Sequence, residues 1–502
     1  MTPIRQIREL LPLIVVLGLT VVLRLFYLSS LPIDRLEESY GRWLVDVLTI
    51  RNSWSYIGPA LPLDPAVEWL PLFQYISMLV MYISGDFRID ALRLTNLILS
   101  LGTATILYLT LWRVFKSRWQ ATIAVLFLAF QPWNIDYSVT ASDRILLSLQ
   151  ILALTYAMFS GRIKLFSGIA ILTALTAYEG WFIVSLEIAL GLWNRKWSSK
   201  QALIPTLALV CTIGTWLLWN IERTGQPFTF VLGYLGLINY HFELNPEFLS
   251  FYLVLATAMT TGIFLIGLTA TLIRKTNAPR TLLRTLAFLI VGYVGFYSVA
   301  HLVGFETGDL TGRIVPILPL IAASASFVFP DIRFKRRKQI AIGLILLVML
   351  IVPYYAQISI GPKKAYVISP DQRVGVKLRE IYESGKIVSD MPAVIYFSGL
   401  DPSFFITSPN IPWRTGNYSA DGLKRWLQAN QVRYLVWQNS TGSPISEIFP
   451  FLGEPKNYYP DSYWIGQVNF HLVYEDSLFA GNWEHAPTYD GPPSIYLYQI
   501  NI

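Results

Sequence analysis

Charged side chains are scarce in this chain of 502 residues, where Asp, Glu, Lys and Arg together make up 14%. A typical soluble domain has about 25%, so this chain cannot cover a soluble surface with ionised groups. That scarcity excludes intrinsic disorder and a coiled coil. The net charge of +7 would indicate nucleic-acid binding only if it were gathered on one soluble face, and it is instead spread over short loops. We therefore expect no nucleic-acid partner.

Cysteine and histidine are also rare. The one cysteine, Cys211, lies in an apolar run, which excludes a disulfide framework and a cysteine-rich metal site. The four histidines are scattered along the chain, so a histidine metal cluster is not expected. The sequence also lacks a Walker loop, a dinucleotide-binding glycine fingerprint and the HExxH and GxSxG motifs. These patterns point to no certain cofactor.

Apolar residues, in contrast, make up 54% of the chain, and its mean hydropathy is +0.47. A membrane-spanning helix needs about 20 mostly apolar residues. Roughly eleven such runs, some of them short, predict an α-helical polytopic membrane protein. The runs lie near residues 9–30, 92–114, 119–133, 143–160, 163–177, 180–194, 202–220, 248–273, 283–303, 313–330 and 339–356.

Basic side chains in every second loop predict the orientation, because short cytoplasmic loops are enriched in Lys and Arg. The basic loops lie near residues 5–8, 116–118, 162–164, 195–200, 274–284 and 333–338. This alternation predicts a multi-pass protein of the plasma (inner) membrane with a cytoplasmic N-terminus. An odd number of spans then places the C-terminal tail on the extracytoplasmic side.

The predicted domains are a transmembrane region, 1–356, and a soluble exterior domain, 357–502. Within the first, a long exterior loop at 32–92 carries WLVDVLTI and WLPLFQYISMLVMYISG, which we expect to be interfacial helices. In the tail, GVKLREIYESG precedes KIVSD, and DGLKRWLQANQ precedes VRYLVW. Each pair combines an amphipathic helix with a strand, so the tail is expected to be a small α/β domain.

Three carboxylates follow the first apolar run in PIDRLEESYGRW. Asp34, Glu37 and Glu38 lie within five residues, and helical spacing would place Asp34 on the same face as the two glutamates. Carboxylates clustered at a membrane surface raise one another's pKa, which suits a general base. The alternative is a helix N-terminus that favours acidic residues.

Two further acidic residues lie at the ends of apolar runs. In SVTASDRILL, Ser142 resembles an N-cap and precedes Asp143 and Arg144, which suggests either capping with an exterior charge pair or a functional site. In ALTAYEGW, Glu179 is the one charge between two apolar runs. A lone carboxylate at membrane depth is a candidate functional residue, and a solvated turn is the alternative.

Two arginines lie at predicted exterior helix ends. Arg223 follows the seventh run, and Arg313 begins the tenth, against the tendency of exterior loops to lack positive charge. Such an arginine needs an anionic partner. A phosphate fits, because the guanidinium group binds it through two hydrogen bonds. A pair with Glu306 or Asp309 is the alternative.

Carboxylates and arginines from several loops would thus meet at one end of the helices, in a polar cavity open to lipid and to the exterior. This arrangement suits an enzyme with a lipid-linked donor and an exterior acceptor. A transporter or flippase of a lipid-linked substrate is the alternative from another class, although no internal repeat or matched pair of broken helices supports it. A structural membrane subunit whose tail binds a partner is a third.

The order of several short motifs resembles one family. The motifs are Glu37, Glu38 and Tyr40 after the first helix; Trp69, Pro71 and Leu72 in the long loop; Arg93 at the start of a helix; Pro132, Ser138 and Asp143 in one turn; the YEGW turn; and RIVPILPLIA. Together they resemble the GT-C superfamily of membrane glycosyltransferases, in the branch of protein mannosyltransferases and aminoarabinose transferases. One departure is Leu36, which stands where the family has an Asp before its Glu. The tail lacks the WWD motif of oligosaccharyltransferases.

The resemblance implies an inverting transferase that uses a polyprenyl-phosphate-linked sugar. Glu37, or its neighbours Glu38 and Asp34, would be the base that accepts the proton of the acceptor, which is a protein, lipid or glycan. Arg313 and Arg223 would neutralise the lipid phosphate. The remaining implied substrate-binding residues, some of which could instead hold a divalent cation, are Tyr40, Asp143, Tyr178 and Glu179.

Overall fold

The structure, a computed structural model, describes residues 3–28, 70–84, 89–115, 118–224, 227, 280–302, 310–327, 351, 370–407, 410–413, 415–438, 444–453, 462–477 and 494–502. The chain divides into two compact units, one helical and one built around a sheet. The predicted boundary at 356/357 lies outside the described residues and remains a prediction.

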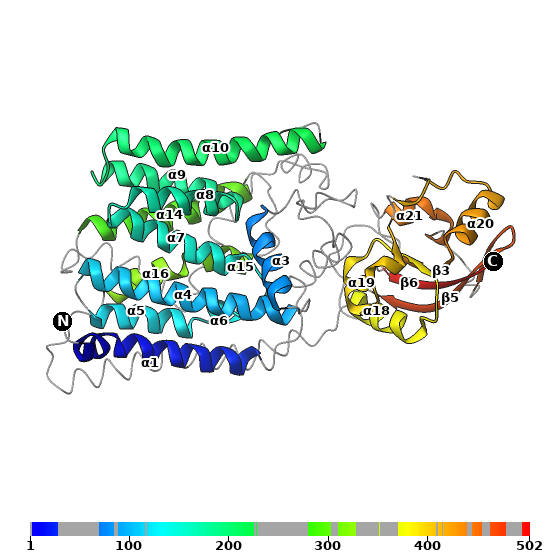
Figure 1. Ribbon diagram of the computed structural model, residues 1–502, viewed down its shortest axis with the longest axis horizontal. Helices are drawn as coiled ribbons and strands as arrows, with labels where there is room; N and C mark the ends of the chain where they lie inside the picture. Colours follow the sequence, from blue (N-terminus) through cyan, green and yellow to red (C-terminus); the bar gives the residue numbers. More distant parts are fainter. Residues whose placement is uncertain are drawn as a thin grey trace. The chain divides into compact units, whose positions relative to one another are not determined.

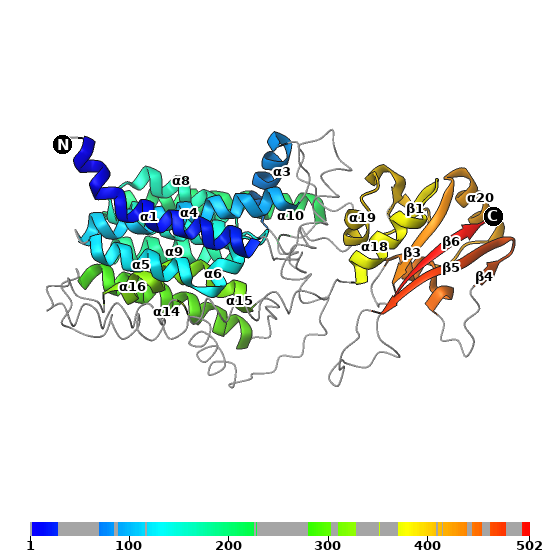
Figure 2. The same ribbon diagram turned by 90° about the horizontal axis from the view of Figure 1, so that it is seen from below.

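Most helices of the helical unit run alongside one another, while α3 crosses them at a steep angle (Figures 1 and 2). Its elements are α1 (Pro3–Leu28), α3 (Leu72–Ser84), α4 (Ile89–Phe115), α5 (Arg118–Phe130), α6 (Pro132–Tyr137), α7 (Arg144–Phe159), α8 (Ile163–Ala174), α9 (Tyr178–Trp193), α10 (Ser199–Thr224), α14 (Arg280–Leu302), α15 (Leu310–Ile314), the 3₁₀ turn η2 (Val315–Ile317) and α16 (Leu318–Ser326).

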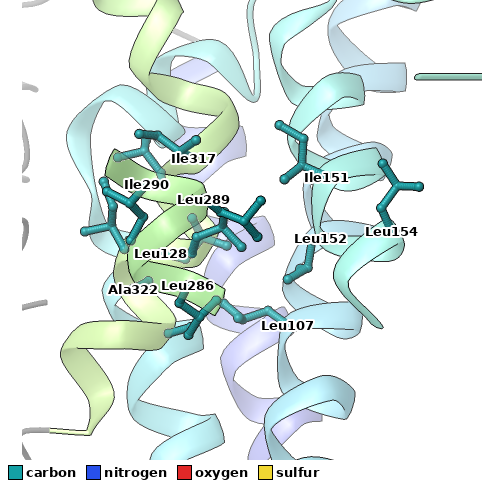
Figure 3. Packing of buried hydrophobic residues seen from close by; sticks show 14 of the residues in the cluster. Leu107, Leu128, Ile151, Leu152, Leu154, Leu286, Leu289, Ile290, Ile317 and Ala322 are labelled. Carbon is teal, nitrogen blue, oxygen red and sulfur yellow. The ribbon is translucent and has the colours of Figure 1, made fainter. Parts of the chain in front are cut away.

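Apolar side chains cover these helices on nearly all sides, as expected of helices that face either a core or lipid. A cluster of buried residues fills the spaces between them, including Leu107 of α4, Ile151 of α7 and Leu289 of α14 (Figure 3). Other large apolar side chains point outward, and Val22 of α1 and Leu218 of α10 are both more than half exposed. Exposed aliphatic surface of this extent is what a lipid-facing helix presents.

The prediction of a polytopic helical membrane protein is confirmed. Among the described helices, four are long and apolar enough to cross a membrane, and four shorter ones are also apolar. The total of eleven remains a prediction, since the run at 248–273 and nearly all of the run at 339–356 lie outside the described residues. The sidedness of the chain also remains a prediction.

The C-terminal unit has a mixed sheet with strand order β2-β1-β3-β6-β5-β4. Strands β1 to β3 are parallel to one another, while β6, β5 and β4 continue the sheet antiparallel. Its elements are α18 (Pro370–Ile381), β1 (Lys386–Val388), α19 (Pro392–Ser398), β2 (Phe405–Ile406), α20 (Ala420–Ala429), β3 (Val432–Gln438), α21 (Pro444–Ile448), β4 (Ser462–Ile465), β5 (Val468–Ser477) and β6 (Ser494–Asn501).

Successive residues of β3 enter two different cores, because side chains alternate across a strand. Tyr434 and Val436 pack on the side of α18 and α19, whereas Leu435 and Trp437 pack on the side of α20 and α21. Both predicted helix-strand pairs are present, as α18 with β1 and α20 with β3. The prediction of a C-terminal α/β domain is therefore confirmed.

A charged contact joins α18 to β5 in this unit. Arg373 donates from Nε and Nη2 to Asp476 at 2.5 and 2.8 Å, and the Tyr474 hydroxyl donates at 3.0 Å. Partial burial raises the pKa of Asp476, but the hydrogen bonds from Arg373 and Tyr474 lower it more, so it lies below the ordinary 3.8. The stabilisation is therefore present above 3.8 and is lost as the pH falls through the lowered pKa.

We predict that Asp476→Asn destabilises the C-terminal unit by about 1 kcal/mol at neutral pH, a value limited by solvent screening of the half-exposed Arg373. Amide hydrogen exchange of β5 in the full chain would measure the effect. The difference from wild type should shrink when the pH falls below 3.8. Glu380→Gln, which alters an exposed pair with Lys377 on α18, is the matched control and should have little effect. If Asp476→Asn destabilised the unit equally at neutral pH and below pH 3.8, this account would be contradicted.

Candidate active site

Glu179, in the first turn of α9, is the centre of a buried charged network. Its Oε1 accepts hydrogen bonds from Arg144 Nη1 at 2.8 Å, from Arg313 Nη1 at 2.5 Å and from the Tyr297 hydroxyl. The four residues come from α7, α9, α14 and α15. One carboxylate oxygen thus joins four helical segments that lie far apart in the sequence.

The two arginines are not equally compensated. Arg144 faces a second carboxylate, because the Asp143 Oδ1 lies 3.6 Å from the Arg144 Nε. Among the described residues Arg313 pairs with Glu179 alone, and its guanidinium group lies over the ring of Tyr297. The side chain of Arg313 is 24% exposed, compared with 10% for Arg144 and 6% for Glu179. The Nε atoms of both arginines are buried and lack a hydrogen-bond partner within the described part of the chain, but only that of Arg144 faces a carboxylate, Asp143. Arg313 is therefore the cation of this network that can best accept a further anion.

The other three residues of the YEGW turn, Tyr178, Gly180 and Trp181, contribute to the position of Glu179. The Tyr178 hydroxyl accepts a hydrogen bond from Trp216 of α10 at 3.3 Å, and Trp181 donates to the Ala174 carbonyl at the end of α8 at 2.8 Å. A Cβ on Gly180 would lie 2.4 Å from the Thr173 carbonyl oxygen, so glycine is required where α9 approaches α8. The turn is therefore fixed against both neighbouring helices.

The turn before α7 is held equally firmly. Asn96 of α4 is fully buried and donates to the Thr140 and Ser142 carbonyls at 2.6 and 2.7 Å. The Ser142 hydroxyl accepts from the Arg144 N–H at 3.2 Å, and Asp143 is the residue directly before the helix. The N-cap residue is therefore Asp143 and not Ser142, as the sequence suggested, although the Ser142 hydroxyl still accepts from the first N–H of the helix. The charge pair between Asp143 and Arg144 is present.

The helix α3 begins at the same turn as the network. Its Leu72 N–H donates to the carbonyl of Leu175, the residue at the end of α8, at 2.9 Å. With 13 residues, α3 is shorter than the roughly 20 that a membrane-spanning helix needs. The expectation that this segment is an interfacial helix remains a prediction.

The structure brings together three of the predicted site residues, Asp143, Glu179 and Arg313, and places Tyr178 beside Glu179. Arg223 lies in α10, but the position of its side chain is outside what the structure describes. Arg313 does not begin a helix, as the sequence suggested, but lies in the last turn of α15 before a 3₁₀ turn with Pro316. The other predicted residues, Asp34, Glu37, Glu38 and Tyr40, as well as Glu306 and Asp309, lie outside the described residues.

Two residues of this region were missed by sequence reasoning. Tyr297 contacts both Glu179 and Arg313, yet a tyrosine in an apolar helix is usually a core residue. Glu187 of α9 is fully buried two turns beyond Glu179 and accepts one hydrogen bond, from Thr155 at 2.8 Å. A single acid within the apolar run SLEIALGLW was a signal that could have identified Glu187.

No protein-family model and no curated protein sequence matches the chain. Among solved structures, it is similar to ArnT from Cupriavidus metallidurans bound to undecaprenyl phosphate, with a TM-score of 0.58 at 12% identity over 96% of this chain and 97% of that one. It is also similar to the archaeal oligosaccharyltransferase AglB from Archaeoglobus fulgidus in complex with an inhibitory peptide and a dolichol-phosphate. That match has a TM-score of 0.52 at 12% identity over 87% of this chain and 70% of that one.

The apo structure of the same ArnT gives a TM-score of 0.55 at 12% identity, over 84% of this chain and 92% of that one. These neighbours are GT-C glycosyltransferases, and the chain has their fold. The predicted resemblance is therefore confirmed for the fold, and the activity is considered below as a proposal.

Two buried glutamates of α9 allow the network to be tested against a matched control. We predict that Glu179→Gln destabilises the helical unit by about 3–5 kcal/mol, because it leaves Arg313 without its described counter-charge and Arg144 with Asp143 alone. Glu187→Gln should change the stability by less than about 1 kcal/mol, because the amide can still bond to Thr155 and no ion pair of Glu187 occurs among the described residues. Thermal unfolding of the full chain in one detergent would measure both. Equal shifts for the two variants would show that the Glu179 ion pairs do not stabilise the unit.

Proposed function

We propose that the chain is an inverting membrane glycosyltransferase that moves a sugar from a polyprenyl-phosphate carrier to an extracytoplasmic acceptor. The observation that carries the proposal is the pair Arg144 and Arg313 around Glu179, in a chain with the GT-C fold. The donor class is supported by the fold neighbours, one bound to undecaprenyl phosphate and another in complex with a dolichol-phosphate.

In this proposal Arg313 binds the lipid phosphate. Its Nη1 is held by Glu179 and its buried Nε has no described partner, so we place a phosphate oxygen at the Nε and Nη2 edge of the guanidinium group, which makes no described hydrogen bond. Charge-assisted hydrogen bonds of this kind are the stronger class. The positive charge would stabilise the phosphate as it leaves with the electron pair of the bond to the sugar. Arg223 is proposed to assist from the end of α10.

The first-loop carboxylates supply the base. The acceptor oxygen attacks the anomeric carbon on the side opposite to the phosphate, and Glu37, or Glu38 or Asp34 in its place, takes the acceptor proton. The bond from the anomeric carbon to the phosphate oxygen breaks as the new bond forms, so the configuration inverts. A positioned general base contributes about 10²–10⁴ in rate.

The remaining predicted residues are proposed to bind the sugar. Asp143, Tyr178 and Tyr40 carry the polar groups for this, whereas Glu179 acts mainly on the arginines that it already contacts. No set of three His, Cys, Asp or Glu side chains among the described residues could hold a metal ion. A divalent cation at Asp143 would therefore need ligands from residues outside the described part of the chain.

The base is tested by Glu37→Gln, which keeps the size of the side chain and its hydrogen bonds but cannot take a proton. We predict a loss of at least about 10²-fold in the rate of single-turnover sugar transfer, the lower end for a general base, with a milder loss for Glu38→Gln. Release of free polyprenyl phosphate should fall in parallel. Wild-type rates in both variants would exclude these two glutamates, and transport of intact donor without phosphate release would favour a flippase.

The phosphate role is tested by Arg313→Ala and Arg313→Lys. Both variants should weaken the binding of polyprenyl phosphate, because lysine keeps the charge but cannot donate two parallel hydrogen bonds. Binding of the uncharged polyprenol should not change, and this provides the control for folding. Unchanged affinity for polyprenyl phosphate in Arg313→Ala would remove Arg313 from this role.

A further inference from the structure

Tyr297 contacts both charged partners of the proposed phosphate site. Its hydroxyl donates to Glu179 Oε1 and lies 3.3 Å from Arg313 Nη1, so the oxygen can accept from the arginine while the proton goes to the carboxylate. The centre of its ring lies 5.5 Å from the guanidinium carbon of Arg313. One side chain thus provides both a polar contact and a ring contact to Arg313.

The orientation of the Arg313 guanidinium group depends on its contact with Tyr297. Arg313 lies in a helix of five residues followed by a 3₁₀ turn, and its side chain is the most exposed of the two arginines and Glu179. A guanidinium group recognises phosphate through a planar array of N–H groups, so its orientation decides whether two parallel hydrogen bonds can form. A long side chain held by a single ion pair can still rotate, and a second contact restricts that rotation.

The surroundings of Tyr297 favour positioning over direct contact with substrate. Its side chain is 4% exposed, and its ring packs edge-to-face against Tyr293 and Phe296 on the same helix. Because the hydroxyl is already engaged by Glu179 and Arg313, it has no free proton to give to a ligand.

We infer that Tyr297 is a positioning residue that sets the plane of the Arg313 guanidinium group for the phosphate of the lipid-linked donor. This inference rests on the proposed function, because it needs Arg313 to bind a phosphate. Tyr297 would act through Arg313 and Glu179 and would not touch the donor itself.

The chain offers a matched control in Tyr293. It lies one turn earlier on α14, is equally buried and has a hydroxyl that makes no described hydrogen bond to Glu179 or Arg313. Tyr293→Phe and Tyr297→Phe therefore remove the same atom from the same helix, and one of the two hydroxyls contacts Arg313. A general effect of losing a phenol from this helix would appear in both variants.

The experiment measures the affinity of the full chain in detergent for polyprenyl phosphate and for polyprenol of the same length. We expect Tyr297→Phe to weaken the binding of polyprenyl phosphate about tenfold, the effect of losing one hydrogen bond to a charged group. Binding of polyprenol should be unchanged, and Tyr293→Phe should alter neither. In an Arg313→Lys background, Tyr297→Phe should have a much smaller effect, because the group that it positions is gone.

The possible failures are distinguishable. If Arg313→Ala weakens polyprenyl phosphate binding and Tyr297→Phe does not, the positioning role is wrong and the proposed function stands. The positioning role is also overturned if Tyr297→Phe weakens both lipids equally or has its full effect in the Arg313→Lys background. If wild type does not prefer polyprenyl phosphate to polyprenol, the proposed function itself fails.

Discussion

The carboxylate of Glu179 is the constraint on which the described site depends. Two guanidinium groups and a phenol donate to the same oxygen atom, so α7, α14 and α15 are all held to the first turn of α9. A buried ion network is costly to assemble and more costly to break, because removing one partner leaves the others charged and unpaired. The surrounding structure therefore has to place Glu179 accurately. Trp181 fixes the YEGW turn by a hydrogen bond to the Ala174 carbonyl, and Gly180 allows that turn to pack closely against α8. Asn96 fixes the turn that carries Arg144 by donating to the Thr140 and Ser142 carbonyls.

The same network explains how the charged Arg313 can be accommodated in a mostly apolar helical unit. Arg313 without an anion would be expensive where little water reaches it. Glu179 offsets that cost and leaves one edge of the guanidinium group unpaired among the described residues. Phosphate binding would then add an anion without first requiring Arg313 to leave its partner. This is preorganisation in the physical sense, since the orientation is fixed before the ligand arrives.

Local patterns predicted many of the described elements, although not the break between α15 and α16, and they could not predict the long-range contacts between elements. The length of the apolar runs predicted α4, α9 and α10, and helix-strand amphipathicity predicted α18 with β1. The partner of Arg313 could not be predicted, because Glu179 is 134 positions away and the pairing arises only when α9 packs near α15. Neighbours in sequence, Glu306 and Asp309, were considered instead. Tyr297 was missed because the apolar pattern of its helix gives no information about the partner of the tyrosine hydroxyl.

The most direct test of the central claim is the structure of the full chain with undecaprenyl phosphate in a lipid nanodisc. The account predicts a phosphate oxygen about 3 Å from Arg313 Nε or Nη2, with Arg313 Nη1 still bonded to Glu179. A phosphate bound away from Arg313, with Arg313 and Glu179 unchanged and facing no ligand, would contradict it.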